Sequence, residues 1–469
     1  MSWHQVDDVD RTAKILIDSG RAVDSDDARR CLQNQVLQVA VGPGLEQDRA
    51  GQAALATAVN TASRAFLGGV HVRLDTDPVL TVGWTKGHTA SDTVCRFGGT
   101  VTDHLVDAYP TVVIGAPGDA APGAPVLYLQ YRGWCAAVLR TPDPDFASAR
   151  RTGITPAGIL AAALGVSETF QQQLGAVTPG RRDVGLSLWR PDLPWREAEA
   201  VGPELKYLPS SLWLLGLGHL GQAFAWTLGL LPYANPGHVQ IGLVDFDVAV
   251  KGNTSTQLLT RADQAGQRKT RITAAALEEL GIGTRIVDRG FDKHFHSTTH
   301  ANPARNEPTV ALAGFDSIGP RQLLDLDQAN FTRIVDAGLG AGPVEYLDMV
   351  LHTFPAARGP ALVFAGPPPA APRPVLPQAY EDEIDRQVDA GKDQKAVRCG
   401  MLDVAGVTVG AAFVGAAAST FVVADLLRVL HGGAALTNLA LDLRQPEALR
   451  SSRNDHPEAN RPPLFTTAH

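Results

Sequence analysis

Short apolar runs, each followed by a glycine-rich turn and a helical pattern, occur twice along the chain. In the later passage the run at 212–215 leads into Gly216-Leu217-Gly218-His219-Leu220-Gly221, and a helical pattern then continues to about residue 231. Further strands are expected at 239–244, 309–313 and 333–336. A short apolar run such as 212–215 is typical of a strand that is buried on both faces of a parallel sheet. The later passage therefore predicts alternating strands and helices.

The earlier passage has the same order. An apolar run at 37–41 precedes Gly42-Pro43-Gly44, and a helical pattern spans 49–66. The remaining elements are expected strands at 70–74 and 111–115, and alanine-rich helices that close the two passages at 156–170 and 412–430. Alternating strands and helices predict doubly wound parallel sheets. We expect two tandem Rossmann-like α/β units that form an internal pseudo-dimer. The alternative is that two unrelated α/β domains share this coarse pattern.

Changes in composition predict where the units end. Residues 1–180 form the first unit, and 181–209, rich in proline, arginine and glycine, are expected to be a linker. Residues 210–451 form the second unit, and 452–469 are expected to be a polar tail. Inside the second unit, 354–398 holds Pro367-Pro368-Pro369 and then a charged stretch. This composition predicts an exposed crossover segment.

The overall composition is that of an ordinary globular protein, with 44% hydrophobic and 19% charged residues. A formal net charge of -8 gives no basic field that would attract nucleic acid or an anionic membrane. The polar, acidic start of the chain differs from a signal peptide, and four scattered cysteines without a CxxC pair fit a reducing cytoplasm. We therefore expect a cytoplasmic protein with no nucleic acid partner.

One uncharged stretch, 404–424, is long enough to cross a bilayer. It consists mostly of small residues, and it runs into Asp425 and Arg428 with helical spacing. This pattern favours a buried helix over a membrane span, so no membrane contact is expected.

The glycine turn at Gly216, Gly218 and Gly221 is a phosphate-binding signal because glycine lets the backbone approach an anion at a helix N-terminus. Most such turns bind a nicotinamide or flavin cofactor, and an acidic residue about 20 residues later holds the ribose. Asp245, at the end of the next strand, is placed for that role. The residues that follow differ from those of a dehydrogenase.

Asp245 begins a D-x-D motif with Asp247, and polar residues follow at fixed spacing. They are Asn253, Gln257, Lys269 in Gly266-Gln267-Arg268-Lys269, and Asp316, with Arg321 five residues further on. Over about 210–340 this order resembles the ThiF, MoeB and ubiquitin-activating superfamily. The resemblance implies that the unit binds ATP and Mg²⁺. It implies that Asp245 holds the ribose, that Lys269, Asn253 and Gln257 contact the polyphosphate, and that Asp316 binds the metal.

The sequence departs from the superfamily pattern at Thr256, which occupies the place of an arginine. A neutral hydroxyl cannot replace a guanidinium on phosphate. Arg261, Arg268 or an arginine from the first unit could compensate. Related proteins insert an arginine from an N-terminal helix of the partner half, which favours Arg11 over Arg21.

The first unit lacks the corresponding chemistry. Glycines, Gly83 and Gly99, occupy the places of the asparagine and the lysine, and Glu46 would repel phosphate near its glycine turn. The first unit is therefore expected to be an inactive half that supports the active one.

Cys399 follows the crossover segment, where ubiquitin-activating proteins carry the cysteine that accepts the activated tail. Lys395 and Arg398 would favour its thiolate. The alternative is a small buried apolar residue, because free cysteine is usually buried.

The favoured function is ATP-dependent activation of the C-terminus of a ubiquitin-like protein, which is then forwarded to a conjugating enzyme. Bacterial ubiquitin-like conjugation systems, whose activating proteins pair an inactive and an active half, are the most concrete resemblance. Three alternatives stay open: adenylation of a sulfur carrier, a peptide or a tRNA base; an NAD(P)-dependent oxidoreductase; and a non-catalytic scaffold, for which Thr256 is the best argument. Homodimerisation beyond the internal pairing is also left open.

Overall fold

The structure is a computed structural model that describes residues 6–119, 122–147, 153–295, 308–324, 330–365 and 376–468. The start of the chain and the proline run Pro367-Pro368-Pro369 of the expected crossover segment lie outside the described residues.

The first half contains a seven-stranded sheet with the order β3-β2-β1-β4-β5-β6-β7. Its strands are β1 (Val36–Val41), β2 (Gly69–Leu74), β3 (Thr100–Val101), β4 (Thr111–Ile114), β5 (Val126–Arg132), β6 (Cys135–Leu139) and β7 (Val184–Ser187). Strands β3, β2, β1, β4 and β5 are parallel to one another. Strands β6 and β7 extend the sheet in antiparallel pairing. The central strands β1 and β4 are buried along their whole length, which explains their apolar sequences.

The second half contains an eight-stranded sheet with the order β11-β10-β9-β12-β13-β14-β15-β16. Its strands are β9 (Ser211–Leu215), β10 (Gln240–Val244), β11 (Gly283–Val287), β12 (Val310–Ala313), β13 (Arg333–Leu339), β14 (Asp348–Phe354), β15 (Leu436–Asp442) and β16 (Arg450–Arg453). Strands β11, β10, β9, β12 and β13 are parallel to one another, and β14, β15 and β16 follow in antiparallel pairing. This order repeats that of the first sheet with one strand added at the edge, so the expected tandem Rossmann-like fold is confirmed.

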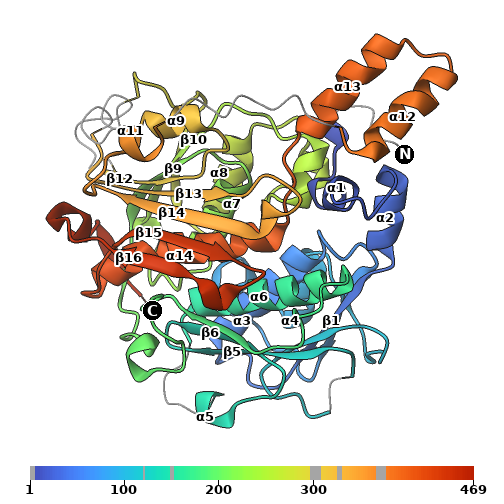
Figure 1. The fold of residues 1–469 in the computed structure, drawn as a ribbon. Helices are drawn as coiled ribbons and strands as arrows, with labels where there is room; N and C mark the ends of the chain where they lie inside the picture. Colours follow the sequence, from blue (N-terminus) through green and yellow to red (C-terminus); the bar gives the residue numbers. More distant parts are fainter. Residues whose placement is uncertain are drawn as a thin grey trace.

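Helices cover both sheets (Figure 1). They are α1 (Arg11–Asp18), α2 (Ser25–Gln33), α3 (Arg49–Ala62), α4 (Ala90–Arg96), α5 (Pro144–Ala147), α6 (Thr155–Gln173), α7 (His219–Gly229), α8 (Lys269–Glu279), α9 (Ile318–Gln322), α11 (Pro360–Val363), α12 (Gln378–Asp389), α13 (Gln394–Gly406) and α14 (Ala412–Leu430). The two long alanine-rich helices, α6 and α14, occur at the positions expected from the sequence.

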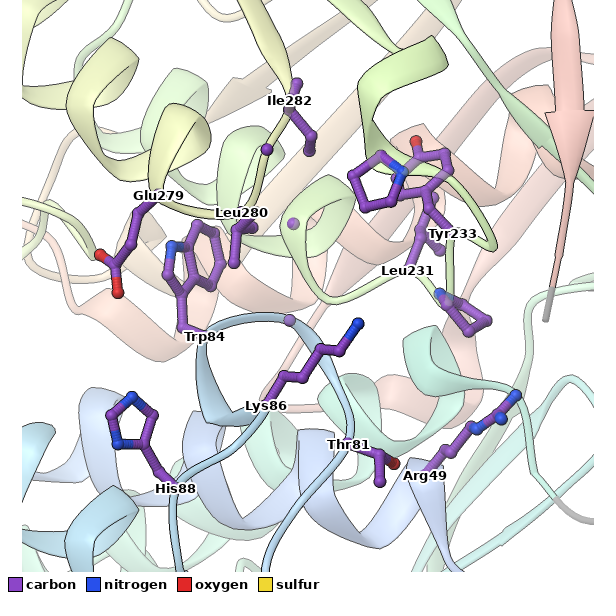
Figure 2. Close-up of a pocket in the computed structure, with 15 residues that line it drawn as sticks. Arg49, Thr81, Trp84, Lys86, His88, Leu231, Tyr233, Glu279, Leu280 and Ile282 are labelled. Carbon is purple, nitrogen blue, oxygen red and sulfur yellow. The ribbon is translucent and has the colours of Figure 1, made fainter.

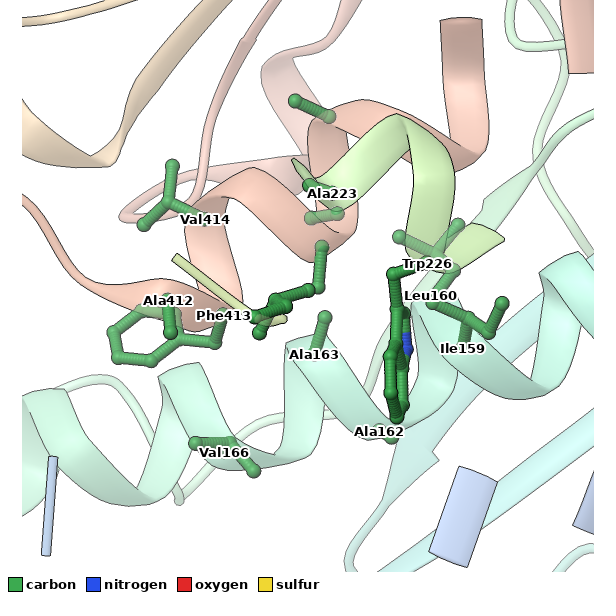
Figure 3. Close-up of a cluster of buried hydrophobic side chains, with 14 of the residues drawn as sticks. Ile159, Leu160, Ala162, Ala163, Val166, Ala223, Trp226, Ala412, Phe413 and Val414 are labelled. Atoms are coloured by element: carbon green, nitrogen blue, oxygen red, sulfur yellow. The ribbon is translucent and has the colours of Figure 1, made fainter. Parts of the chain in front are cut away.

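Helices from both halves meet in one continuous core. Figure 3 shows α14 residues Ala412 and Phe413 beside α6 residues Ala163 and Val166, with Trp226 of α7 close by. Among the described residues, α14 is the one helix that is long and apolar enough to cross a membrane, and 94% of its most apolar stretch is buried inside the protein. The expectation of a buried helix is met for α14. The uncharged stretch 404–424 is not one continuous helix, however, because α13 ends at Gly406 and α14 begins at Ala412.

Two expectations about the connecting segments need correction. The segment 181–209 is more than a linker, because it contributes β7 to the first sheet and a short strand, β8 (Tyr207–Pro209). The polar tail is also structured: β17 (Phe465–Thr467) pairs with β8 in antiparallel register. Composition did not reveal this pairing because it depends on backbone hydrogen bonds, which do not require apolar side chains.

The charged part of the expected crossover segment forms a helical hairpin of α12 and α13. In Figure 1 the hairpin extends away from the two sheets beside α1 and α2. Tyr380 on α12 donates to Asp18 (Oη to Oδ1, 2.7 Å), and the Lys14 ammonium donates to the carbonyl of Ala405 at 3.2 Å. The hairpin is therefore anchored to the N-terminal helices of the first half.

Candidate functional site

A cavity of about 460 Å³ lies at the carboxyl ends of the parallel strands of the second sheet. It is bordered by the turns after β9, β10 and β12, and strand order reverses between β9 and β12. Doubly wound sheets bind ligands at this kind of switch point. Of the residues expected at the site, the cavity is lined by Arg11, Gly216, Gly218, Asp245, Asp247, Gln257, Lys269 and Asp316.

The glycine turn has the backbone that each of its glycines permits. Gly216 has φ of +80°, which favours glycine. A Cβ on Gly221 would lie 1.9 Å from the carbonyl oxygen of Gly216, so this position brings helix α7 close to strand β9. Gly218 has no atom within 4 Å of a would-be Cβ, which leaves open space at the start of the helix for a ligand.

Asp245 is tied to the glycine turn. Its Oδ2 accepts from the backbone N–H of Leu217 at 2.6 Å, and its Oδ1 accepts from that of Asp247 at 2.7 Å. Burial raises the pKa of this carboxyl, although both backbone hydrogen bonds lower it. Each carboxylate oxygen has a further lone pair, so Asp245 can still accept from a ribose hydroxyl.

Lys269 is the first residue of α8 and points into the cavity. Its Nζ lies 2.7 Å from Oδ2 of Asp247, and 10% of its side chain is exposed against 45% for Asp247. A nearly buried ammonium with one carboxylate partner retains further N–H donors for an anionic ligand. The lysine and the second aspartate of the D-x-D motif, 22 residues apart in the sequence, are therefore paired in the fold.

Asp316 follows β12 and presents an exposed carboxylate to the cavity. In the described parts of the chain, there is no cluster of three or more His, Cys, Asp or Glu residues that could hold a metal ion. Mg²⁺ commonly binds through one or two carboxylates together with substrate phosphates. The residues present fit that mode and not an all-protein cage.

Arg11 is the arginine that the first half contributes to the cavity. It lies at the N-terminus of α1 and donates from Nη1 to Oγ1 of Thr408 at 3.1 Å. Its backbone N–H donates to Oγ of Ser255, also at 3.1 Å. Burial lowers the pKa of its guanidinium, while Asp316 and Asp247 raise it. Arg261 and Arg268 instead contact Asp263 and the Phe246 carbonyl, and neither lines the cavity.

Gln257 and Asn253 lie in the segment after the D-x-D motif. Gln257 lines the cavity and its Oε1 accepts from Nε2 of Gln222 at 3.0 Å, whereas the Asn253 Oδ1 accepts from the backbone N–H of Val250 at 3.1 Å. Asn253 is buried and lies outside the cavity lining, where it closes its own turn. Its expected contact with polyphosphate stays a prediction.

Arg64, which sequence reasoning missed, fixes this segment from the first half. Its guanidinium donates to the carbonyls of Thr254, Leu258 (3.1 Å) and Thr260 (3.3 Å). Burial lowers the pKa of Arg64 to about 10. Arg64 had no recognisable signal, because it lies in the turn after α3, in the half without site motifs.

His219 occupies the variable position of the glycine turn and was also missed. Its ring lies against α14: a Cβ on Gly415 would be 2.5 Å from His219 Nε2. Nε2 is buried without a hydrogen-bond partner, although the residue as a whole is partly exposed. Burial, assisted by the nearby Arg11 charge, lowers the pKa of His219 to about 3. The imidazole is therefore neutral at physiological pH.

Cys399 lies in the middle of α13 and is exposed, which excludes the alternative of a buried structural cysteine. It does not line the cavity. Arg398, expected to favour its thiolate, pairs with Glu381 at 2.8 Å. The structure thus leaves Cys399 accessible but apart from the residues around the glycine turn.

A second cavity, of about 440 Å³, lies between the two halves. Figure 2 shows Lys86 and Arg49 of the first half facing Leu231 and Tyr233 of the second half across it. Among the described residues that line this cavity, none belongs to the expected site.

The fold and the site define the class of protein: a tandem pair of Rossmann-like units in which the second carries a glycine-turn cavity completed by an arginine from the first. Residues 36–188 match the family described as BilD N-terminal domain, and residues 208–433 match BilD C-terminal domain. The chain belongs to the BilD family.

A relative from Collimonas sp. (strain OK412), named Bacterial E1-like protein BilD, is 36% identical over 436 residues, which cover 92% of this chain and 90% of the relative. Its name agrees with the superfamily resemblance found in the sequence.

Solved structures of Escherichia coli MccB are more distant. The complex with AMPCPP and MccA shows 14% identity and a TM-score of 0.32, and it covers 53% of this chain and 65% of that chain. The complex with ATP shows 14% identity and a TM-score of 0.31, with 52% and 64% covered. A likeness at this level supports no conclusion about the ligands of this chain.

Proposed function

We propose that this chain uses ATP to adenylate the C-terminal carboxylate of a ubiquitin-like protein. The observation that carries the proposal is the convergence of Lys269, Asp316 and Arg11 on one glycine turn. A dinucleotide-dependent dehydrogenase has no need of a lysine at the position of Lys269 or of a carboxylate at the position of Asp316. The E1-like name of the Collimonas relative supports the same class of reaction.

In the proposed reaction the substrate carboxylate attacks the α-phosphate of ATP. One P–O bond forms to the carboxylate, and the bond to the β-phosphate breaks, so pyrophosphate leaves with its negative charge. Lys269 and Arg11 would stabilise that charge through N–H donors in a partly dry cavity. Mg²⁺ held by Asp316 would neutralise phosphate oxygens. Asp245 would hold the ribose.

The first half would act as a support. It supplies Arg11 to the cavity, and Arg64 fixes the segment that carries Gln257. Thr256, in place of the superfamily arginine, is buried. In this proposal Arg11 supplies the guanidinium that the superfamily arginine would provide.

We further propose that Cys399 accepts the activated tail before a conjugating enzyme takes it. Its thiolate would attack the acyl-adenylate carbonyl, forming a thioester and releasing AMP. The exposure of Cys399 on the hairpin of α12 and α13 supports access for both partners. The step requires the tail to travel from the cavity to the hairpin, or the hairpin to move.

ATP–pyrophosphate exchange tests the proposal. The full chain is incubated with ATP, Mg²⁺, labelled pyrophosphate and a candidate small ubiquitin-like protein. We expect label in ATP only when that protein has its intact C-terminus. In Cys399→Ala the exchange should persist, while a thiol-labile adduct with the small protein should disappear. Exchange that ignores the small protein, or its complete absence, contradicts the proposed function.

A further inference from the structure

A cluster of three charged or ionisable side chains lies under the β13 end of the cavity. Asp336, in the middle of β13, is 0% exposed. Its Oδ1 is 3.3 Å from Nε of Arg321, and its Oδ2 is 3.9 Å from Nδ1 of His352, its cross-strand neighbour on β14. Arg321 lies on α9 and lines the cavity.

Several polar atoms of this cluster are buried without a hydrogen-bond partner. They are both carboxylate oxygens of Asp336, Nε of Arg321 and Nδ1 of His352. Burial raises the pKa of Asp336, and His352 and Arg321 lower it. A buried carboxylate with imperfect hydrogen bonding is a poor contributor to stability, because desolvation offsets its attraction to a counter-ion. The charged group nearest to this carboxylate is the guanidinium of Arg321.

The guanidinium of Arg321 is held on several sides. Nη2 donates to the carbonyl of Ala337, and the group lies directly on Gly338, where a Cβ would come within 2.5 Å of Nη2. Phe364 lies on another side, with its ring centroid 5.6 Å from Cζ. Only 13% of the side chain is exposed, so the guanidinium is fixed and its remaining N–H donors can serve a ligand in the cavity.

The strand order determines which end of a ligand would meet Arg321. Along the sheet edge, Asp245 follows β10, the glycine turn follows β9, Asp316 follows β12, and Arg321 lies over β13. Strands are spaced by about 4.8 Å, so β10 and β13 are separated by about 14 Å. Arg321 therefore lies at the end of the cavity opposite the carboxylate that would hold the ribose.

We propose that Arg321, positioned by the buried Asp336, binds an oxyanion at the β13 end of the cavity. The oxyanion is either the carboxylate of the acceptor tail or a phosphate oxygen of ATP, since both suit a fixed guanidinium fork. Asp336 acts through Arg321 and is a positioning residue. The inference rests on the proposed function for the identity of its two candidate ligands.

The test compares Arg321→Gln, Asp336→Asn and the double variant with the wild-type chain. Calorimetry measures affinity for Mg²⁺–ATP, adenosine and inorganic pyrophosphate, and pyrophosphate exchange measures the half-saturating concentration of the small protein. Arg271→Gln, an exposed arginine outside the cavity lining, is the control.

We expect Arg321→Gln to weaken the binding of one ligand by about tenfold or more, as for loss of a hydrogen bond to a charged group. If affinity for ATP and pyrophosphate falls while adenosine binding is unchanged, the oxyanion that Arg321 binds is a phosphate of ATP. A raised half-saturating concentration of the small protein, with unchanged ATP affinity, identifies the carboxylate. Asp336→Asn should reproduce the effect, and the double variant should lose no more than Arg321→Gln alone, because the two residues act as one unit. A purely structural role would lower thermal stability without this selectivity.

Unchanged affinities for all probes in a folded Arg321→Gln chain overturn the inference, and if exchange continues the proposed function still stands. Conversely, the wild-type chain could bind pyrophosphate more tightly than Arg321→Gln and yet catalyse no exchange. That result supports the inference and rejects the proposed function. Additive losses in the double variant overturn the positioning role of Asp336.

Discussion

At the scale of single residues, the side chains around the glycine turn are held by partners that a ligand could replace. Lys269 and Asp247 form an ion pair at 2.7 Å in which the lysine is nearly buried and the aspartate is half-exposed. Phosphate oxygens carry more charge than one carboxylate, so Lys269 can exchange its partner when a nucleotide enters. Asp247 would then face solvent.

Lys269→Ala is expected to reduce the rate of pyrophosphate exchange by about 10²–10³-fold, as for loss of one stabilising donor at a developing charge. Lys251→Ala is the matched control, because Lys251 is 57% exposed, lies 3.9 Å from Asp8 and is outside the cavity lining. Equal rates in the two variants would remove Lys269 from the catalytic machinery.

His219 gives a prediction about pH. Its pKa is lowered to about 3 in the folded chain by burial, whereas an unfolded histidine titrates near its ordinary value of about 6.5. Between these values the unfolded state binds a proton that the folded state does not, so stability should decrease as pH falls from about 6.5 towards 3. One proton corresponds to a slope of up to about 1.4 kcal/mol per pH unit.

The check is the free energy of unfolding in denaturant at pH 4.5 to 7 for wild type and His219→Asn. The difference in free energy between the two chains should shrink or reverse as pH falls, because the variant lacks the titrating ring. Parallel pH profiles would show that the histidine is already solvated in the folded chain.

Residues that carry the site were predictable to different degrees. Lys269, Asp245 and Asp316 could be found because their spacing along the chain is shared with a known superfamily. Arg11 was favoured only by analogy with partner halves, and Arg64 and Asp336 had no signal at all. Their roles depend on contacts between segments that are distant in sequence, such as Arg64 with Leu258 (3.1 Å).

At the scale of elements, the buried parallel strands and the alanine-rich helices were predictable, whereas the edges were not. Strands β1 and β9 are buried at every position, so their sequences are mostly apolar. The edge strand β16 is polar and mostly exposed, and β17 lies in what composition marks as a tail. Pairing at the edge of a sheet depends on strand register and on backbone hydrogen bonds, and neither can be read from the side chains of a single sequence.

Deletion of residues 464–469 tests the role of β17. The deletion removes three cross-strand pairs with β8, the contact between the rings of Tyr207 and Phe465 (5.0 Å), and the hydrogen bond from Ser210 to Leu464. We expect a loss of about 2 kcal/mol in the free energy of unfolding. Leu464→Ser, which keeps the backbone pairing and changes an exposed side chain, should cost less than about 0.5 kcal/mol. Denaturant unfolding measures both.

At the scale of the whole molecule, the two halves share one core and are expected to unfold together. Trp84 from the first half stacks on Trp226 from the second, with centroids 5.0 Å apart and planes 13° apart. The indole N–H of Trp84 donates to the Ala276 carbonyl at 2.9 Å. Its ring also lies against Gly229, where a Cβ would be 2.3 Å from Cη2. Tryptophan at this junction therefore aligns the halves.

Trp84→Ala should destabilise the chain by about 3–5 kcal/mol, as for large-to-small changes in a core, while keeping a single cooperative transition. Val79→Ala, at a side chain that is 57% exposed, is the control. Two separate transitions in the wild-type chain, by calorimetry or fluorescence, would contradict the shared core.

The central claim is that an adenine nucleotide binds over the glycine turn of the second half, where Lys269 and Arg11 meet it. Isothermal titration calorimetry of the full chain with Mg²⁺–ATP, and separately with NAD⁺, tests this claim most directly. We predict uptake of one ATP per chain, loss of at least about tenfold in affinity in Lys269→Ala and in Arg11→Ala, and no binding of NAD⁺. Saturable NAD⁺ binding, or no uptake of ATP by the folded wild-type chain, would contradict the account.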